Sequence, residues 1–169
     1  ERAASLTKQL LAFSRRQMLT PQVLNLAAVI DKLASMLRRL IGERITFSTN
    51  YASGERCVRV DRGQPEHGLL TLVVHARDAM PDGGTLTITT ERRLIDAEAA
   101  RAHVDLTPGA YLAIAVRDTG VGMTAEVQSR AFDPFFTTKE LGRGTGLGLA
   151  TVYGIVRQAH GAISVESTV

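Results

Sequence analysis

Two glycine-rich segments place the strongest constraint on the fold of this chain. DTGVGM (118–123) ends the apolar run YLAIAVRD, and GRGTGLGL (142–149) opens a helical pattern. Glycine lets the backbone adopt positive φ and lets a ligand approach closely. A glycine-rich loop that opens a helix also presents free N–H groups and the positive end of the helix dipole, which suit phosphate. Each segment alone is also typical of a flexible loop; together they predict a phosphate-binding pocket.

Two common phosphate motifs do not account for these glycines. The second segment lacks the Lys-Ser/Thr pair of a P-loop, and the glycines do not follow a strand at the spacing of a dinucleotide-binding turn. Asp118 ends an apolar strand pattern, so we expect its carboxylate at the rim of a pocket or inside it, where it needs a polar partner. A purine amino group is a suitable donor; a capping or turn role is the alternative.

The segment between the glycines, AFDPFFTTK (131–139), adds two further expectations. Adjacent phenylalanines in a loop are unfavourable to expose, so we expect Phe135 and Phe136 to pack under a lid or against a partner. Lys139 is expected to neutralise a terminal phosphate, with an ordinary exposed lysine as the alternative.

Hydrophobic periodicity predicts the remaining elements. We predict helices over 3–18, 27–40, 64–80 and about 146–160, and strands over 22–25, 45–50, 57–61, 85–90, 111–118 and 162–167. Residues 91–109 are predicted to be a loop with one helical turn. Gly42 is predicted to cap the C-terminal end of the helix over 27–40. The fold class predicted is α+β, a two-layer sandwich with helices on one face of a mixed β-sheet, preceded by one amphipathic helix.

Composition narrows the class of protein. The 169 residues are 44% hydrophobic and 22% charged, which suits a soluble protein with one main core. The net charge of +3 is not gathered in one block, so we interpret it as a solvated basic surface and expect no nucleic-acid partner. Cys57 is the only cysteine, which excludes an intrachain disulfide and suits a reducing cytoplasm. No apolar stretch reaches the roughly 18–20 residues of a membrane span.

Four motifs, in this order, resemble the ATP-binding domain of sensor histidine kinases, in the GHKL ATPase superfamily. LLTLVVHARDAMPDGG (69–84) is similar to the N box, DTGVGM to the first glycine box, FDPFFTTK to the F box and GRGTGLGLATVYGIV to the second glycine box. The opening helix, SLTKQLLAFSR, resembles the second helix of the dimerisation and phosphoacceptor hairpin. The resemblance covers nearly the whole chain and implies the sandwich fold of gyrase-type topoisomerases, ATP-driven heat-shock chaperones and mismatch-repair ATPases.

The resemblance implies two parts, which we expect to be a piece of a longer protein. Residues 1–20 would be the end of the hairpin, and residues 21–169 would be the ATP-binding catalytic domain, truncated at its C-terminus. Residues 124–143 would form a mobile lid, which Phe135 and Phe136 would anchor unless they touch the hairpin instead.

The resemblance also implies roles for individual residues. Asp118 would bind the adenine amino group, with Gly120 and Gly122 shaping that wall. Lys139 and Asp78 are also expected to bind the nucleotide. The phosphates would meet backbone and hydroxyl groups of the second glycine box, at Gly144, Thr145, Gly146, Leu147 and Gly148. The implied cofactors are ATP and Mg²⁺.

The implied reaction is phosphoryl transfer from ATP to a histidine and then to a receiver-domain aspartate, by positioning and charge neutralisation. None of the four histidines lies in a suitable hairpin context, so we assign no catalytic residue within the chain. The implied partners are ATP, the phosphoacceptor hairpin of the same or a sister subunit, and a response-regulator receiver domain. The full-length protein is expected to be a cytoplasmic homodimer, and its attachment to a membrane is left open.

The N box departs from the family pattern at two positions. Thr71 and His75 stand where the family has two asparagines, the second of which coordinates Mg²⁺, so the resemblance places the metal site at His75 and Thr71. Mg²⁺ prefers oxygen ligands, whereas imidazole suits Zn²⁺, Ni²⁺ or Cu²⁺ better. Three hypotheses stay open: an active kinase in which water or Asp78 holds the metal, a degenerate domain that binds nucleotide weakly or without metal, and a deliberate or adventitious substitution.

Two functions from different classes follow from these departures. The first is the ATP-binding domain of a two-component sensor histidine kinase, with its activity in doubt. The alternative is a degenerate kinase domain that acts as a nucleotide-binding sensor or scaffold without Mg²⁺-dependent kinase activity. A gyrase- or chaperone-type hydrolase is disfavoured, because Thr71 occupies the place of the glutamate base that such enzymes need.

Overall fold

A computed structural model gives the structure of the protein and describes residues 20–52, 54, 57–102, 106–140 and 144–169. The helix predicted over 3–18 lies outside the described residues, as does all of the predicted first domain except Thr20. The boundary near residue 20 therefore stays a prediction.

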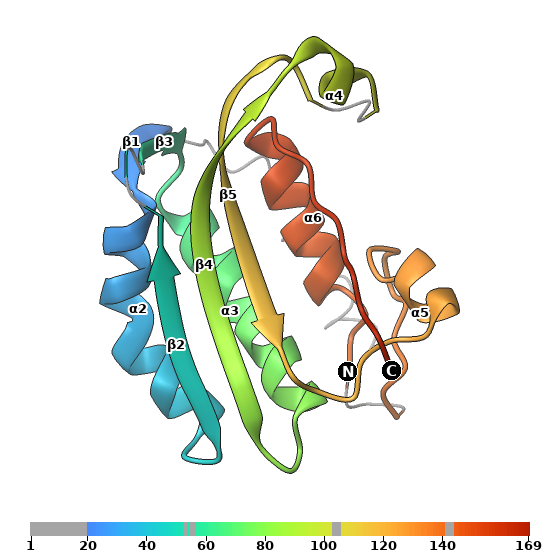
Figure 1. Cartoon of the computed structure of the whole chain (residues 1–169). Coiled ribbons are helices and arrows are strands. Elements are labelled where there is room, and N and C mark those ends of the chain that lie inside the picture. The colour runs from blue at the N-terminus through green and yellow to red at the C-terminus, as the bar shows by residue number, and fades with distance from the viewer. Residues whose placement is uncertain (1–19, 53, 55–56, 103–105, 141–143) are drawn as a thin grey trace.

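Three strands form the main sheet (Figure 1). They are β2 (Ile45–Tyr51), β4 (Gly84–Ile95) and β5 (Gly109–Asp118), in the order β2-β4-β5. β2 runs parallel to β4, and β4 runs antiparallel to β5. The predicted mixed sheet is therefore confirmed.

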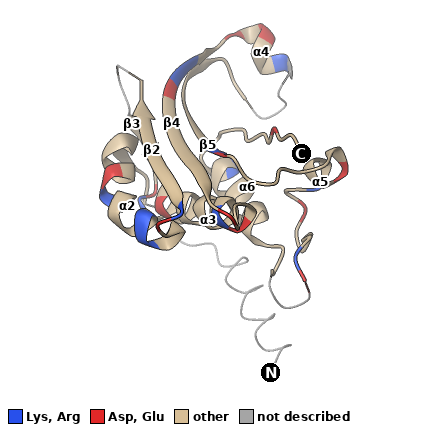
Figure 2. Cartoon of the chain, turned by 60° about the horizontal axis from the view of Figure 1, so that its bottom comes forward, with Lys and Arg blue, Asp and Glu red and all other residues tan. Residues whose placement is uncertain are grey.

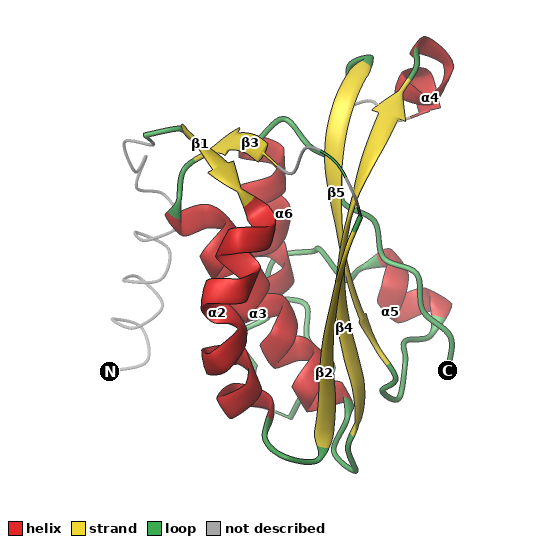
Figure 3. Cartoon of the chain, turned by 60° about the vertical axis from the view of Figure 1, so that its left-hand side comes forward, coloured by secondary structure: helices red, strands yellow, loops and turns green. Residues whose placement is uncertain are grey.

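Three helices form the second layer: α2 (Leu26–Ile41), α3 (Gly63–Ala79) and α6 (Gly148–Gln158). Figure 3 shows α2 and α3 together on one side of the sheet, which confirms the two-layer sandwich. α6 packs on α3. Among the described residues, no helix is both long enough and apolar enough to cross a membrane.

Smaller elements complete the described fold. β1 (Gln22–Asn25) pairs antiparallel with β3 (Cys57–Val60) next to the start of α2. α4 (Ala97–Ala102) lies between β4 and β5, and α5 (Ala125–Ser129) follows the first glycine box.

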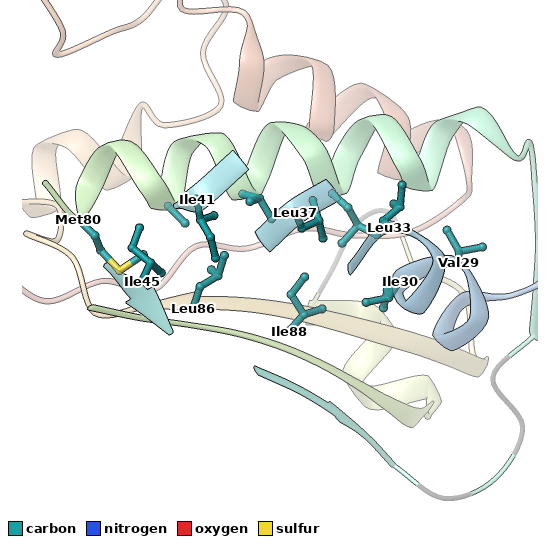
Figure 4. Packing of buried hydrophobic residues seen from close by; sticks show 12 residues of the cluster. Val29, Ile30, Leu33, Leu37, Ile41, Ile45, Met80, Leu86 and Ile88 are labelled. Carbon is teal, nitrogen blue, oxygen red and sulfur yellow. The ribbon is translucent and has the colours of Figure 1, made fainter. Parts of the chain in front are cut away.

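The core lies between the sheet and the helices α2 and α3 (Figure 4). The apolar residues of α2 recur every three or four positions, so one face of the helix meets the sheet. Each fully buried aliphatic side chain contributes about 1.5–3 kcal/mol to the free energy of unfolding. The buried cluster comprises Val29, Ile30, Leu33, Leu37, Ile41, Ile45, Leu69, Val73, Ala76, Met80, Leu86 and Ile88.

The ends of α2 follow from local chemistry. Asn25 caps the start, because its side-chain oxygen accepts a hydrogen bond from the Ala28 N–H at 3.3 Å. At the other end the Gly42 N–H donates to the Arg38 carbonyl at 3.1 Å, with φ of 78° at the glycine. The predicted cap at Gly42 is confirmed.

Two predictions about strands are wrong. The expected loop over 91–109 begins as strand, because β4 continues to Ile95 and pairs with the first half of β5. The strand predicted over 162–167 is absent. That segment alternates between exposed and half-buried residues as a strand does, but no ladder of backbone hydrogen bonds joins it to a described strand. It runs from α6 to a chain end beside α5 (Figure 1).

Candidate functional site

The predicted site residues come from segments that meet at one end of the sandwich. These segments are the C-terminal half of α3, the end of β5 and the start of α6. Figure 2 brings this end forward and shows α3 and α6 next to the sheet. The N box and both glycine boxes are therefore neighbours in space, as the sequence predicted.

The first glycine box packs on the end of α3. The Val121 N–H donates to the Ala79 carbonyl at 3.0 Å. A Cβ on Gly120 would lie 2.5 Å from the same carbonyl oxygen, so the two backbones approach too closely for a side chain there. Thr119 ties this turn to the start of β4, because its hydroxyl oxygen accepts from the Thr85 N–H at 3.0 Å.

Asp118 is exposed in this structure. One of its carboxylate oxygens accepts a hydrogen bond from the Gly120 N–H at 2.9 Å, which is the turn role given above as the alternative. A carboxylate oxygen can accept more than one hydrogen bond, so this turn leaves acceptor capacity for a ligand. Its predicted contact with adenine stays a prediction.

Gly122 packs against the C-terminal segment. A Cβ at this position would overlap the Thr168 carbonyl oxygen. Beside it, the Met123 N–H donates to the Ser167 hydroxyl at 2.9 Å, and the Gln128 amide donates to the Ser167 carbonyl at 2.9 Å. These bonds hold the C-terminal segment against the beginning of the predicted lid.

The F box meets the second glycine box through the backbone. The Phe135 N–H donates to the Gly146 carbonyl at 2.9 Å. Gly146 has a φ of 65°, and a Cβ there would overlap the Phe135 backbone. Phe135 itself has a φ of 68°, a conformation that a bulky residue rarely adopts.

The two adjacent phenylalanines have different environments. Phe135 is 52% exposed, so it does not pack under a lid in this structure, and only the alternative of contact with a partner remains for it. The Phe136 ring is half-buried beneath the Arg130 guanidinium, at 4.3 Å from the ring centroid. This contact joins the F box to Arg130, the residue that follows α5, within the segment predicted to form the lid.

The first turn of α6 faces the N box. A Cβ on Gly148 would lie 2.5 Å from His75 Nε2 and 3.2 Å from the Thr71 methyl carbon. Ahead of the helix, the exposed Thr145 hydroxyl accepts from the Leu147 N–H at 3.4 Å. The helix end predicted to bind phosphate thus lies against the two residues that replace the N-box asparagines.

Lys139 reaches from the F box to α3. Its ammonium forms an ion pair with Oδ2 of Asp78, and Oδ1 of Asp78 accepts from Arg77 Nη2 at 2.7 Å and Nε at 3.0 Å. Two of the predicted nucleotide ligands are therefore paired with each other. Arg77 was not predicted, because neighbouring residues on a helix do not usually face each other.

The charges around α3 shift two pKa values. Burial lowers the pKa of His75, the positive charge of Lys139 lowers it further, and Asp78 opposes both effects. Burial raises the pKa of Asp78, but the hydrogen bonds from Lys139 and Arg77 outweigh burial and lower it. The imidazole is therefore held neutral and the carboxylate charged at neutral pH.

The N box does not fit Mg²⁺. The methyl group of Thr71 faces Gly148, His75 offers nitrogen, and the charge of Asp78 is balanced by Lys139 and Arg77 in this structure. Mg²⁺ requires a near-octahedral set of oxygen ligands. Within the described residues, no three His, Cys, Asp or Glu side chains gather into a metal site.

Two surface hollows lie elsewhere. One of about 330 Å³ is lined by β1 and the starts of α2 and α3, and one of about 510 Å³ lies at the C-terminal end of α2. Neither is lined by a predicted site residue, so neither is the candidate nucleotide site.

Residues 60–169 match the protein family described as the histidine kinase-, DNA gyrase B-, and HSP90-like ATPase. The chain belongs to this ATPase family. The match begins at the end of β3 and includes the N box and both glycine boxes, so it covers the residues of the candidate nucleotide site.

Curated relatives of this ATPase domain are sensor kinases. The chain is 48% identical to sensor kinase CckA of Brucella abortus (strain 2308) over 99% of the chain and 18% of that protein. It is 30% identical to the sensory histidine kinase/phosphatase NtrB of Rhizobium leguminosarum bv. phaseoli, over 99% of the chain and 43% of that protein. The chain spans less than half the length of each of these relatives.

Solved structures share the fold of this ATPase domain. A mycobacterial sensor histidine kinase, MprB, superposes with a TM-score of 0.63 at 24% identity, covering 85% of this chain and 83% of that one. The histidine kinase ThkA, in complex with the response regulator protein TrrA, superposes with a TM-score of 0.60 at 21% identity, covering 95% and 41%. The chain is therefore a domain of this ATPase family that is similar to domains of sensor histidine kinases.

Proposed function

We propose that this domain positions ATP for phosphoryl transfer to a histidine outside this chain, in a hairpin to which residues 1–20 belong. The observation that carries the proposal is the approach of His75 and Thr71 to the first turn of α6 at Gly148. Because of this approach, a nucleotide bound at the second glycine box would also contact the N box. The turn at Asp118 packs on the same helix, α3, at Ala79.

Each part of the site then has a chemical task. Asp118 accepts a hydrogen bond from the adenine amino group, and the close packing at Gly120 holds that carboxylate in position. The N–H groups of the segment 144–148 and the start of α6 meet the phosphates, where the helix dipole favours negative charge. Lys139 supplies a positive charge to the terminal phosphate.

The same proposal assigns a weak dependence on Mg²⁺, because the N box offers a nitrogen at His75 and its Asp78 carboxylate is paired with two cations. Calorimetric titration with ATP in the presence of Mg²⁺ and of EDTA tests it. We expect ATP to bind in both conditions with dissociation constants within about threefold, less than the tenfold that 1.4 kcal/mol represents. Strong tightening by Mg²⁺ would refute the assignment, and no binding in either condition would refute the nucleotide site itself.

The second candidate function is a nucleotide-binding sensor or scaffold without Mg²⁺-dependent kinase activity. Thr71 and His75 favour it, whereas Asp118 and both glycine boxes are consistent with either function. A phosphotransfer assay with the full-length protein, Mg²⁺-ATP and its receiver domain separates the two. Phosphate on the receiver domain supports the kinase, and ATP binding without transfer supports the sensor.

The proposed partners follow from the proposed reaction. They are ATP, the phosphoacceptor hairpin of the same or a sister subunit in a homodimer, and a receiver domain in the cytoplasm. The complex of the structural relative ThkA with the response regulator TrrA supports a receiver partner.

A further inference from the structure

The pair between Lys139 and Asp78 joins two segments that are 61 residues apart in the chain. Asp78 lies in the last turn of α3, and Lys139 ends the F box. Both side chains are about one-third exposed, at 29% and 33%, so the pair lies at the surface of the site. A partner that enters from solvent can therefore reach either group.

The stem of Lys139 lies against the second glycine box. A Cβ on Gly144 would be 3.4 Å from Cβ and Cδ of Lys139 and 2.7 Å from the Thr137 hydroxyl. That hydroxyl also accepts from the Lys139 N–H at 3.2 Å. The ammonium lies close enough to His75 for its charge to act on that imidazole, whose Nε2 faces Gly148. Lys139 thus lies between Asp78 and the backbone predicted to meet the phosphates.

Asp78 has two cationic partners, one on each oxygen. Arg77 is the neighbour of Asp78 on α3 and holds Oδ1 through two N–H groups. Lys139 comes from a different segment and holds Oδ2. If the ammonium leaves, Asp78 still has the guanidinium, so no uncompensated carboxylate remains beside α3.

We propose that Lys139 is an exchangeable counter-ion, whose ammonium moves from Asp78 to the terminal phosphates when ATP binds, so that Asp78 restrains nucleotide binding. This inference rests on the proposed nucleotide site. A lysine suits the role, because its ammonium is a compact charge on a flexible stem with three rotatable donors. The exchange replaces one charge-assisted hydrogen bond by another, and the triphosphate is the more highly charged acceptor.

The exchange also brings a positive charge to the terminal phosphates, where Mg²⁺ would otherwise supply it. Without ATP, the same cation is held by Asp78, a residue of the N-box helix itself. Removing Asp78 therefore strengthens ATP binding and removing Lys139 weakens it, although the two residues form one pair. Removing Arg77 leaves Lys139 as the main partner of Asp78, which holds the ammonium more firmly and weakens ATP binding.

The experiment is a titration of the whole chain with ATP in EDTA, by calorimetry. We expect Asp78→Asn to tighten binding about threefold to tenfold and Lys139→Gln to weaken it about tenfold, the scale of one hydrogen bond to a charged group. The double variant should bind like Lys139→Gln, because Asp78 has nothing left to restrain. Arg77→Gln should weaken binding by a few-fold.

Glu91→Gln is the matched control, because it removes the same unit of charge at an exposed ion pair with Arg93. Glu91 is five residues along β4 from Leu86, the partner of Asp118, which is about 17 Å at strand spacing. We expect the affinity of Glu91→Gln for ATP to equal that of the parent chain. Thermal unfolding without nucleotide establishes that each variant is folded. If Asp78→Asn does not fold, Arg77→Gln tests the proposal in its place.

Three results would overturn the exchange. Asp78→Asn could weaken ATP binding, which would make the carboxylate a ligand of the nucleotide. It could tighten binding equally when Lys139 is already Gln, which would make the effect long-range charge alone. All variants could bind ATP like the parent chain. In each of these cases the proposed nucleotide site survives, whereas a parent chain that binds no ATP would remove both proposals.

Discussion

His75 is the residue at which nucleotide and metal chemistry diverge from the family pattern. Its Nε2 faces the first turn of α6, and its imidazole lies near the opposite charges of Lys139 and Asp78. A neutral imidazole offers one nitrogen acceptor and one N–H donor. It is therefore suited to contact a phosphate through its N–H and is a poor ligand for Mg²⁺.

Replacing His75 with the family residue tests this position. We expect His75→Asn to restore metal coupling, so that Mg²⁺ tightens ATP binding by about tenfold, within the range over which metal-site residues change affinity. Calorimetric titration with ATP, with and without Mg²⁺, measures the coupling. His67→Asn is the matched control, because His67 is exposed near the start of the same helix. An unchanged coupling in His75→Asn would mean that this side chain points away from the phosphates.

The lowered pKa of His75 predicts how stability changes with pH. Its ordinary value is 6.5, and burial together with Lys139 places the folded value below that. The unfolded chain then binds protons that the folded chain rejects, so stability falls as pH drops below about 6.5 towards the folded pKa. Asp78 does not contribute in this window, because a carboxylate with a lowered pKa loses its stabilisation only below its ordinary 3.8.

Urea denaturation at pH 7 and pH 5 measures the effect. We expect the fall in the free energy of unfolding between these pH values to be smaller in His75→Asn than in the parent chain. In His67→Asn the fall should match that of the parent. Equal falls in all three proteins would show that His75 takes up its proton as readily in the folded chain as in the unfolded one.

At the scale of elements, the F box meets the second glycine box through two residues with an unusual backbone conformation. Phe135 and Gly146 both have positive φ and are joined by one backbone hydrogen bond. That bond fixes the F box against the loop that opens α6. Because Gly146 has no room for a Cβ, the second glycine of GTGLG is required by packing as well as by any phosphate.

Gly146→Ala should therefore disrupt the loop. We expect ATP binding to weaken by about tenfold or more, because the new methyl group must displace the Phe135 backbone and an alanine at positive φ is strained. Gly154→Ala is the control: it lies in α6 with no atom near the added methyl, so it should leave ATP binding unchanged and stabilise the chain by about 0.5–1 kcal/mol. Calorimetry and thermal unfolding measure the two effects. Equal affinities in both variants would contradict a role for this loop.

Sequence periodicity predicted the helices α2 and α3 and the strand β2 to within two residues, because each buries one regular face. It failed for Glu91–Ile95, which is a strand paired with Gly109–Ala113 although its charged residues interrupt the hydrophobic alternation. It also failed for 162–167, where the alternation is present but the partner strand is not. A strand depends on a neighbour that is distant in sequence, so local pattern alone does not determine it.

The same limit applies to the site. The glycine boxes and the N box were found from spacing, since each motif is local. The pair between Lys139 and Asp78 was not, because it depends on how the F box folds back over α3. The exposure of Phe135 was missed for the same reason: hydrophobicity predicted burial, and only the turn geometry shows which way the residue faces.

At the scale of the whole molecule, the four motifs lie at one end of the sandwich, and the core lies between the rest of the sheet and the helices. The described histidines are His67, His75 and His160, and His103 lies outside the described residues. His67 and His75 belong to α3, and His160 follows α6. None of these three is on a helical hairpin, which is the context that the proposed reaction requires of its phosphoacceptor histidine.

We therefore expect no phosphorylation of the chain by itself. Incubation with ATP labelled on the γ-phosphate, with Mg²⁺ and separately with Mn²⁺, should leave no base-stable label on the protein. The full-length protein is the positive control, and its label should be lost when its phosphoacceptor histidine is changed to glutamine. Label retained by the chain, and removed by a change at His67 or His160, would place an acceptor within it. Label on neither protein, while both bind ATP, would instead favour the nucleotide sensor, since binding would then be uncoupled from transfer at the scale of the whole protein.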